Sequence, residues 1–409
     1  MKTAVLLLAS CFFLLFVLTT FVSYPGAIDE ARAAGFDADD IATGLQYTFE
    51  RRFFFWGATL LELALLCVLA LTTLSRRLAD RFLAASGKRR ILAMLALGAL
   101  YLGLHELLFM PFGIARLYHA RYWGMSNLGF LDWLRDRYLA VGINLVGETV
   151  AVVGFYALLI LLPRVWWLIA PVGLSGLAVG YAFLAPIWIN PLFNTFTPLE
   201  QTEWKDHQPR VRALIDKAKV PVQEILVMNA SRQSNHSNAY FTGFGSTRRI
   251  VLYDTLLKNH TEAEIESILA HELGHWRQDH IVKGIVLGTL AALLGFFVLD
   301  RCLRAAMGRG PWNLQSIADP AGLPLVLLLM NLGGWVAMPI GNAVSRYFER
   351  QADHASLELA GQTEAFIAAE LKLAKVNKSN VAPAPWNVWL FSSHPPTVER
   401  IRMAREWKQ

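Results

Sequence analysis

The chain has 409 residues, of which 55% are hydrophobic and only 17% are charged. A soluble protein carries about 25% charged residues, so the composition excludes an ordinary soluble enzyme. The net charge of +6 would suit a nucleic-acid binder. However, the basic residues lie mostly in loops and near the ends of apolar stretches, which favours contact with anionic lipid. Three cysteines lie in or beside apolar segments and form no disulfide framework: Cys11, Cys67 and Cys302.

Several apolar stretches of roughly 17 or more residues are long enough to cross the ~30 Å hydrocarbon core of a bilayer. They predict a mainly α, polytopic membrane protein with about seven transmembrane helices. The first stretch follows Lys2 like a signal peptide, but it continues through Val22 without a clear A-x-A site, which favours a retained anchor. The stretches are 4–22, 53–75, 90–112, 139–162, 165–189, 284–300 and 323–344.

These stretches divide the chain into four parts. Residues 1–194 form an N-terminal membrane region with five predicted spans, and 195–282 form a polar insert. Residues 283–344 contain two further spans, and 345–409 form a polar tail. If the tail completes a site that begins in the insert, the two polar parts must meet. We therefore expect one catalytic domain that is split by two spans.

Several predicted spans carry polar groups that hydrocarbon would not solvate. A charge at mid-membrane costs a few kcal/mol or more unless it faces protein or water. Two interpretations are open: a polar, water-containing interior, or pairwise hydrogen bonds between packed helices. The residues concerned are Glu62, Glu106, Asn144, Glu148, Asn331 and Asn342.

The insert contains signals for both helices and strands. Residues 207–219 are typical of a short helix, and 224–229 of a strand. Residues 238–244 and 249–253 are rich in aromatic and β-branched side chains, and Gly245-Ser246-Thr247 between them predicts a hairpin turn. We expect the insert to carry a small β-hairpin or sheet.

The most informative motif is HExxH at residues 271–275. Thr261 and Glu264 form a capping-box pattern, which predicts that a helix begins just before the motif. His271 and His275 lie four residues apart on one helical face, so both imidazoles can reach a single Zn²⁺. Glu272 follows the first histidine, where it can hold the attacking water without being a ligand. The pattern predicts a zinc peptidase.

A bare HExxH match is only moderately specific, and the chain contains its own control. His105 and Glu106 begin a similar string, but Phe109 stands where the second histidine would be. Because this string also lies in the third predicted span, we interpret His105 as an interior polar group.

A catalytic zinc site usually has three protein ligands and leaves one position to water. The best candidate for the third ligand is Glu349, four residues before Asp353 on the same predicted helical face. One of these carboxylates can bind the metal while the other accepts the free N–H of a ligating histidine. A solvated, charged helix below a membrane span is the alternative interpretation of this string.

Four motifs follow one another along the chain: HSNAY at 236–240, HELGH at 271–275, SRYFERQAD at 345–353, and SHPP at 393–396 followed by Glu399-Arg400. In this order they resemble the motifs of the CAAX prenyl protease type I family of integral-membrane zinc metalloproteases. The similarity covers most of the chain, and it implies a split, gluzincin-like metalloprotease domain after the fifth span. The region around Gly124-Met125-Ser126, with Trp133 and Asp136, is only weakly similar.

The resemblance implies a role for each matched residue. His271, His275 and Glu349 would be the ligands of one Zn²⁺ per chain, and Glu272 would be the general base. Asp353 would be the hydrogen-bond partner of a ligating histidine. The neighbouring Arg346 would have a structural or electrostatic role.

Two further motifs gain a role only through the resemblance. His394 would lie near the metal and stabilise the tetrahedral oxyanion. Asn238, Ala239 and Tyr240 would form a strand edge that pairs with the substrate backbone. From the residues alone, His394 would be a loop histidine, and Asn238 and Tyr240 ordinary hairpin residues. Four other histidines are left outside the site: His207, His260, His280 and His354.

The sequence therefore predicts a membrane-embedded zinc metalloendopeptidase that uses metal-activated water. The resemblance implies substrates with C-terminal CAAX sequences on a prenylated cysteine, from which the last three residues are removed. General quality-control proteolysis of membrane proteins and a non-enzymatic scaffold or adaptor remain alternatives. A transporter is disfavoured because no inverted repeat is visible. The expected partners are a peptide or protein substrate and the lipid bilayer, without nucleic acid.

The two arguments about membrane orientation disagree. A dense basic cluster between the second and third spans belongs in the cytoplasm by the positive-inside rule, which would place the insert on the opposite side. The resemblance instead implies a cytosolic catalytic side, in a bacterial inner membrane or in the endoplasmic reticulum, and we retain this orientation as the expectation. The cluster consists of Arg76, Arg77, Arg81, Lys88, Arg89 and Arg90.

Overall fold

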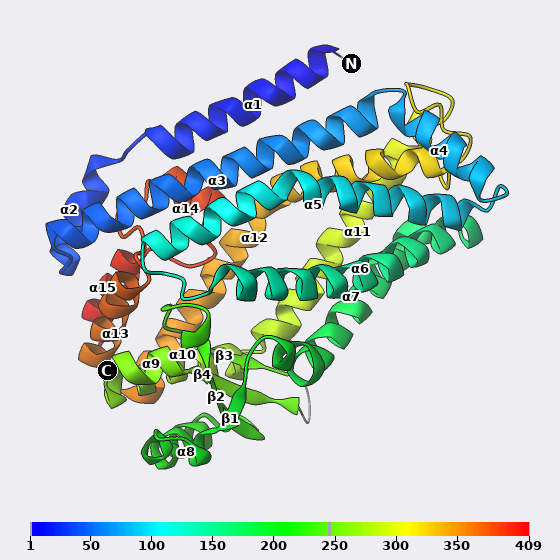
Figure 1. The fold of residues 1–409 in the computed structure, drawn as a ribbon. Helices are drawn as coiled ribbons and strands as arrows, with labels where there is room; N and C mark the ends of the chain where they lie inside the picture. The colour runs from blue at the N-terminus through cyan, green and yellow to red at the C-terminus, as the bar shows by residue number, and fades with distance from the viewer. Residues whose placement is uncertain (1, 244–246, 409) are drawn as a thin grey trace.

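The computed structural model describes residues 2–243 and 247–408, and it is mainly helical. Long helices run side by side in one part of the molecule, and a small sheet with shorter helices lies beyond one end of them (Figure 1). The long helices are α1 (Lys2–Phe21), α3 (Ala38–Leu71), α5 (Arg90–Tyr122), α6 (Phe130–Leu161), α7 (Trp166–Leu184), α11 (His280–Ala306) and α12 (Leu323–Ala360).

Within the described residues, six helices are long and apolar enough to cross a membrane. The number becomes seven if the bent pair of α1 and α2 (Pro25–Ala34) is taken as one span. The two members of this pair meet at an angle of 42°. Pro25 is the first residue of α2, where its missing N–H leaves no hydrogen bond unmade. The prediction of a polytopic, mainly α protein with about seven spans is confirmed.

The remaining helices belong to the ends of the spans and to the polar parts of the chain. An amphipathic helix, α4, joins α3 to α5 at the end of the molecule that lies farthest from the sheet (Figure 1). The others gather around the sheet and the C-terminal half of α12. Their bounds are α4 (Leu74–Ala85), α8 (Gln208–Ala218), α9 (Asp254–Asn259), α10 (Glu262–Arg277), α13 (Thr363–Val376), α14 (Pro385–Phe391) and α15 (Thr397–Glu406).

The sheet has four strands in the order β1-β2-β4-β3. Strands β2 and β4 are parallel, and the two outer strands pair antiparallel to them. The predicted hairpin strands are present as β3 and β4, but two residues of the predicted turn, Gly245 and Ser246, lie outside the described residues. The bounds are β1 (Phe196–Pro198), β2 (Glu224–Met228), β3 (Ala239–Thr242) and β4 (Arg249–Tyr253).

The apolar core is divided between the membrane region and the polar parts. One cluster joins the long helices around Trp56, Tyr156 and Trp166. A second lies between the sheet, α8 and α10, where Ile250 and Leu269 are fully buried. A third holds α2, α13 and α15 against the end of α12. Helix α12 therefore links the membrane core to the polar region, and it carries a residue of the site described below.

Two of the carboxylates within predicted spans are paired with neighbouring helices. The Tyr101 hydroxyl donates to Glu62, and Arg137 Nη2 donates to Glu106 at 2.6 Å. For Glu62 and Glu106 the structure therefore favours hydrogen bonds between packed helices over a water-containing interior. The side chain of Glu148 is exposed, and its place in a water-containing interior stays a prediction.

Candidate active site

Helix α10 presents both histidines of the HExxH motif. It begins with the predicted capping box, in which the Thr261 amide donates to the Glu264 carboxylate at 2.8 Å and the Glu264 amide donates to Thr261 Oγ1 at 3.4 Å. These bonds satisfy backbone donors that a helix N-terminus leaves without partners. The rings of His271 and His275 follow on one face, with centroids 4.9 Å apart.

A glycine within the motif brings α10 close to α12. A Cβ atom at Gly274 would lie 2.8 Å from the Cβ of Ala355 and 3.1 Å from the Cα of Ala352. The two helices thus meet almost backbone to backbone. Ser356 strengthens the contact by donating to the Ser267 carbonyl at 2.7 Å. This close packing lets a side chain of α12 reach the histidines of α10.

His271, His275 and Glu349 converge from the two helices, with ligand atoms that all lie within 4.8 Å of one another. The two Nε2 atoms are 3.2 Å apart, and Glu349 Oε2 lies 3.2 Å from His271 Nε2. This Oε2 atom is buried, with no hydrogen-bond partner among the described residues. Two imidazole nitrogens and a carboxylate oxygen that face one point fit the donor set of a divalent metal.

A buried chain of charges lies behind His271. Its Nδ1 atom faces Asp353 Oδ1 at 2.8 Å, so the ring proton lies on Nδ1 and the Nε2 lone pair faces the cluster. Arg400 Nε donates to the other Asp353 oxygen at 2.9 Å, and Arg400 Nη1 pairs with Glu370 at 2.8 Å. Burial lowers the pKa of Arg400, but the two carboxylates raise it more strongly, so the guanidinium stays charged.

The sequence pattern assigns no role to Arg400 or Glu370. The only sequence signal for either residue was that Arg400 follows the SHPP motif by a few positions. Helices α13 and α15 reach the site through tertiary packing alone, which sequence spacing does not reveal. Asp353, in contrast, contacts His271 as its spacing from Glu349 suggested.

A second chain of hydrogen bonds fixes His275. Its Nδ1 atom lies 2.9 Å from His280 Nδ1, and His280 Nε2 lies 2.9 Å from Gln351 Oε1. Since the amide oxygen only accepts, His280 donates from Nε2 and accepts at Nδ1. His275 then donates from Nδ1, which leaves its Nε2 lone pair facing the cluster. His280 also stacks on Phe348, with ring centroids 4.4 Å apart.

The sequence spacing places His280 outside the site, but in the structure it lies against His275. The physical reason is a break in the helix. Helix α10 ends at Arg277, and Asp279 adopts a left-handed backbone conformation with φ of 54° before α11 begins. The five residues from His275 to His280 therefore do not form one continuous helix, and the two rings can meet. His354, in contrast, lies away from the cluster and packs on Trp407.

Glu272 lines a cavity of about 640 Å³ together with Asn238, His394 and Arg400. Burial raises the pKa of Glu272, and the nearby histidines and a hydrogen bond from the Phe241 amide offset this only in part. A carboxylate with a raised pKa is better matched to proton transfer near neutral pH. The cavity is large enough for several residues of an extended peptide.

His394 lies beside the three candidate ligands, with its Nε2 atom 3.3 Å from Glu349 Oε1. The loop that carries it is held by Arg346, whose Nη1 donates to the carbonyls of Val388 at 2.9 Å and Ser392 at 2.6 Å. Arg346 thus contacts the backbone on either side of the end of α14. It supports the position of His394, and the resemblance had suggested only a structural or electrostatic role.

The predicted strand edge is the outer strand of the sheet. Strand β3 pairs with β4 on one side only, and Asn238 at its start lines the cavity. The Tyr240 ring packs against Tyr253, 6.1 Å away between centroids, and it contributes no surface to the cavity. Because the Phe241 amide reaches Glu272, the free edge of β3 faces the HExxH helix.

The class of protein follows from three features. The chain has several apolar spans, a cluster of two histidines and one glutamate, and a further glutamate beside that cluster. These features are those of an integral-membrane metallopeptidase whose substrate is a peptide or a protein.

Comparison with known proteins gives the family. The sequence profile described as "Peptidase family M48" matches residues 201–408, and the chain belongs to this family of metalloendopeptidases. "Uncharacterized metalloprotease YhfN" of Bacillus subtilis is 30% identical over 397 residues, which is 94% of this chain and 92% of that protein. The resemblance to the CAAX prenyl protease type I family is confirmed.

Eukaryotic relatives match the chain over a shorter range. "CAAX prenyl protease 1" of Saccharomyces cerevisiae is 32% identical over 234 residues, or 53% of this chain and 51% of that protein. The chain thus spans about half the length of these curated relatives. The crystal structure of S. mikatae Ste24p has a TM-score of 0.80, with 22% identity and 97% of each chain covered, which establishes a shared fold.

Proposed function

We propose that this protein is a zinc metalloendopeptidase in which His271, His275 and Glu349 hold the zinc ion. The observation that carries the proposal is the buried Glu349 Oε2 atom, which faces the histidine nitrogens and has no hydrogen-bond partner in the described part of the chain. Histidine and carboxylate ligands in an open tetrahedral site favour zinc. When bound, zinc would polarise the scissile carbonyl and lower the pKa of a coordinated water.

The protein side chains supply proton transfer and charge stabilisation. Glu272 accepts the proton of the attacking water and later delivers it to the leaving amine. The Ser393 hydroxyl lies 2.9 Å from His394 Nδ1 and can donate to it, which leaves the ring proton on Nε2. From there, His394 donates to the oxyanion that develops at the scissile carbonyl. Asp353 and His280 hold the two ligating rings in the required tautomers.

The substrate would lie extended along the free edge of β3. Its backbone would add a strand to the sheet, and Asn238 would contact it from the cavity wall. Ala239 and Tyr240 would serve through the backbone of the strand. We propose peptides with a prenylated CAAX terminus as the substrate class, because proteins named as CAAX prenyl proteases are 32–35% identical to this chain over 53% of its length.

General proteolysis of membrane proteins is the second candidate. It is favoured by the relative that matches along almost the whole chain, a bacterial metalloprotease whose name carries no CAAX substrate. In either case we propose that 195–282 and 345–409 form one catalytic domain, separated in sequence by the membrane helices of 283–344 and preceded by the membrane region 1–194. We propose that this domain faces the cytosol, in a bacterial inner membrane or in the endoplasmic reticulum.

The test compares wild type and Glu272→Gln, purified in detergent, on a farnesylated CAAX peptide and its unprenylated twin. Wild type should cleave, a chelator should abolish cleavage, and zinc should restore it. Glu272→Gln should bind zinc normally and lose activity by roughly 10²–10⁴-fold. Preference for the farnesylated peptide supports CAAX processing, and equal cleavage supports general proteolysis. Full activity in the zinc-loaded variant would contradict the proposed role of Glu272.

A further inference from the structure

The cavity at Glu272 extends past the start of strand β3. Residues of the segment 234–238, which leads into the strand, line one wall, and Asn377 and Ser379 behind α13 line the wall opposite. We call this part of the cavity, formed by the segment 234–238, Asn377 and Ser379, the His236 end. It lies on the side of Asn238 away from the rest of β3, so a peptide paired with the strand can continue into it.

The two walls are tied together at the His236 end. Asn377 Oδ1 accepts from the His236 ring at 3.0 Å and from the Ser237 amide at 3.3 Å, and Asn377 Nδ2 donates to the Ser237 carbonyl at 3.4 Å. Behind the same segment, the loop between α5 and α6 pairs with it through a bridge between Ser126 and Ser234. The His236 end is therefore fixed from two directions.

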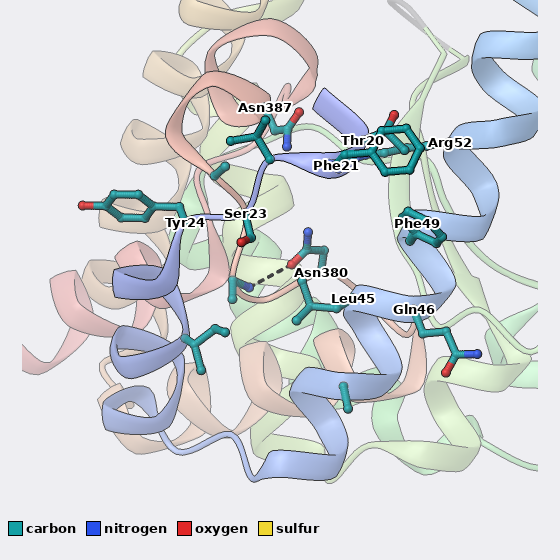
Figure 2. A pocket seen from close by; sticks show the side chains of 15 residues that line it. Thr20, Phe21, Ser23, Tyr24, Leu45, Gln46, Phe49, Arg52, Asn380 and Asn387 are labelled. Atoms are coloured by element: carbon teal, nitrogen blue, oxygen red, sulfur yellow. Dashed lines mark hydrogen bonds between the residues drawn. The ribbon is translucent and has the colours of Figure 1, made fainter. Parts of the chain in front are cut away.

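The segment after α13 also separates the His236 end from a second cavity, of about 430 Å³. Ser379 lines the cavity at Glu272, whereas the next residue, Asn380, lines the second one, and the two cavities share no lining residue. Figure 2 shows the hydrogen bond, 3.0 Å long, that the Ala382 amide donates to Asn380 Oδ1. Helix α3 packs closely on this segment, since a Cβ at Gly44 would overlap the Ser379 carbonyl oxygen. A peptide in the His236 end thus meets a fixed wall.

His236 is the one group in this part of the cavity, among the described residues, that can carry a positive charge. Because the Asn377 amide oxygen only accepts, the His236 ring proton lies on Nδ1. The Nε2 atom has no hydrogen-bond partner in the described part of the chain, and it is not among the buried unpaired atoms, so a ligand can reach it. The other cationic groups of the cavity are engaged: His271 and His394 lie at the metal cluster, and Arg400 is paired with two carboxylates.

The length of the His236 end suits a short C-terminal piece of peptide. A substrate strand antiparallel to β3 points its C-terminal end toward the start of β3. His236 precedes Ala239, the first residue of β3, by three residues, and an extended tripeptide spans about 10 Å. A CAAX substrate has three residues beyond its scissile bond, and the last of them carries a free carboxylate.

We propose that His236 binds the C-terminal carboxylate of the substrate, with Asn377 as the residue that holds the ring in place. This inference rests on the proposed peptidase function and deepens it. Nε2 donates to the carboxylate while Nδ1 donates to Asn377, and the negative charge of the substrate favours the doubly protonated ring. A peptide bond in the interior of a protein has no carboxylate three residues downstream. The His236 end therefore selects chain ends and favours CAAX processing over general proteolysis.

The experiment compares a farnesylated CAAX peptide that ends in a free carboxylate with the same peptide as its C-terminal amide. The zinc-loaded full chain in detergent should cleave both. The amide should have a KM roughly 10- to 100-fold higher at a similar kcat, as expected when a charged hydrogen bond to the bound substrate is lost. The readout is the ratio of kcat/KM for the acid to kcat/KM for the amide, in which a general loss of activity cancels.

His236→Asn should bring this ratio to about 1. Its side-chain amide can still donate to Asn377 near the position of Nδ1, and it ends short of Nε2. His236→Gln, which also lacks the charge, is the second variant if His236→Asn does not fold. Lys378→Gln is the matched control, because Lys378 lines a neighbouring pocket and not the cavity at Glu272. It should keep the ratio of wild type.

A ratio near 1 in wild type would overturn the inference and leave the peptidase function standing. A wild-type ratio in both folded His236 variants would overturn it as well. Loss of the ratio in Lys378→Gln alone would place the carboxylate in the neighbouring pocket instead. No cleavage of either peptide by the zinc-loaded wild type would contradict the proposed function, and the inference would fall with it.

Discussion

His280 lies between a candidate metal ligand and the glutamine that fixes its ring orientation. We predict that His280→Phe lowers zinc affinity roughly 10- to 100-fold, because His275 loses the acceptor that orients it. The substitution keeps the stacking on Phe348. Competition with a chromophoric chelator measures the affinity, and His354→Gln serves as a control outside the site. Wild-type affinity in His280→Phe would show that the hydrogen bond has no effect on the metal.

His260 links stability to pH. It is 7% exposed, and its ring nitrogens have no hydrogen-bond partner among the described residues. Burial lowers the pKa of His260 below its ordinary value of 6.5. As the pH falls below 6.5, the unfolded chain therefore binds a proton that the folded chain does not, and the free energy of unfolding decreases.

We predict that Tm decreases less between pH 7 and pH 5 in His260→Leu than in wild type. The difference corresponds to about 1.4 kcal/mol of unfolding free energy for each unit by which burial lowers the pKa of His260. The measurement uses the apoprotein in chelator, so that release of metal from the site makes no contribution. His207→Gln should leave the slope as in wild type. An unchanged slope in His260→Leu would mean that other groups cause the acid sensitivity.

Residues that follow a fixed spacing could be predicted from the sequence. His271, His275, Glu349 and Asp353 each lie three or four residues from a partner on one helix, so helical geometry brings their side chains together. Arg400 could not be found in this way, because its contact with Asp353 depends on the packing of α15 against α13 and α12.

At the scale of elements, the site depends on how closely α10 and α12 approach. We predict that Gly274→Ala pushes the helices apart, since its new Cβ would lie 2.8 Å from that of Ala355. The expected cost is about 1–3 kcal/mol of stability, together with weaker zinc binding. Thermal unfolding and chelator competition measure the two effects.

Gly284→Ala is the matched control in the neighbouring helix α11. A Cβ at Gly284 would have no heavy atom within 4 Å, so the variant should be as stable as wild type or slightly more stable. If Gly274→Ala behaves in the same way, the spacing between α10 and α12 is not limited by this contact.

The sequence predicted the elements better than their contacts. The apolar stretches, the capping box at Thr261 and the aromatic and β-branched residues of β3 and β4 are local signals, and each element formed where its signal lies. The pairing of β2 with β4 and the short strand β1 were not predicted, because the partners are far apart in sequence. The placement of α13 and α15 beside the site was missed for the same reason.

At the scale of the whole molecule, the basic loop and the sheet lie at opposite ends of the spans (Figure 1). We predict that the tail after α12 is cleaved by a protease added to the cytosolic side of sealed membranes and is protected from the other side. A tag in the loop between α4 and α5 should show the reverse pattern, which makes it the internal control. Protection of the tail on the cytosolic side would reverse the proposed orientation and agree with the positive-inside rule.

The division of the site between α10 and α12 has a consequence for biosynthesis. The two histidines leave the ribosome first, and Glu349 follows only after α11 and the apolar part of α12 have been made. The complete ligand set therefore cannot assemble until both of these helices have entered the bilayer and folded back on each other. A nascent chain would therefore lack peptidase activity during its own insertion, and a failed insertion would leave a precursor without its third ligand.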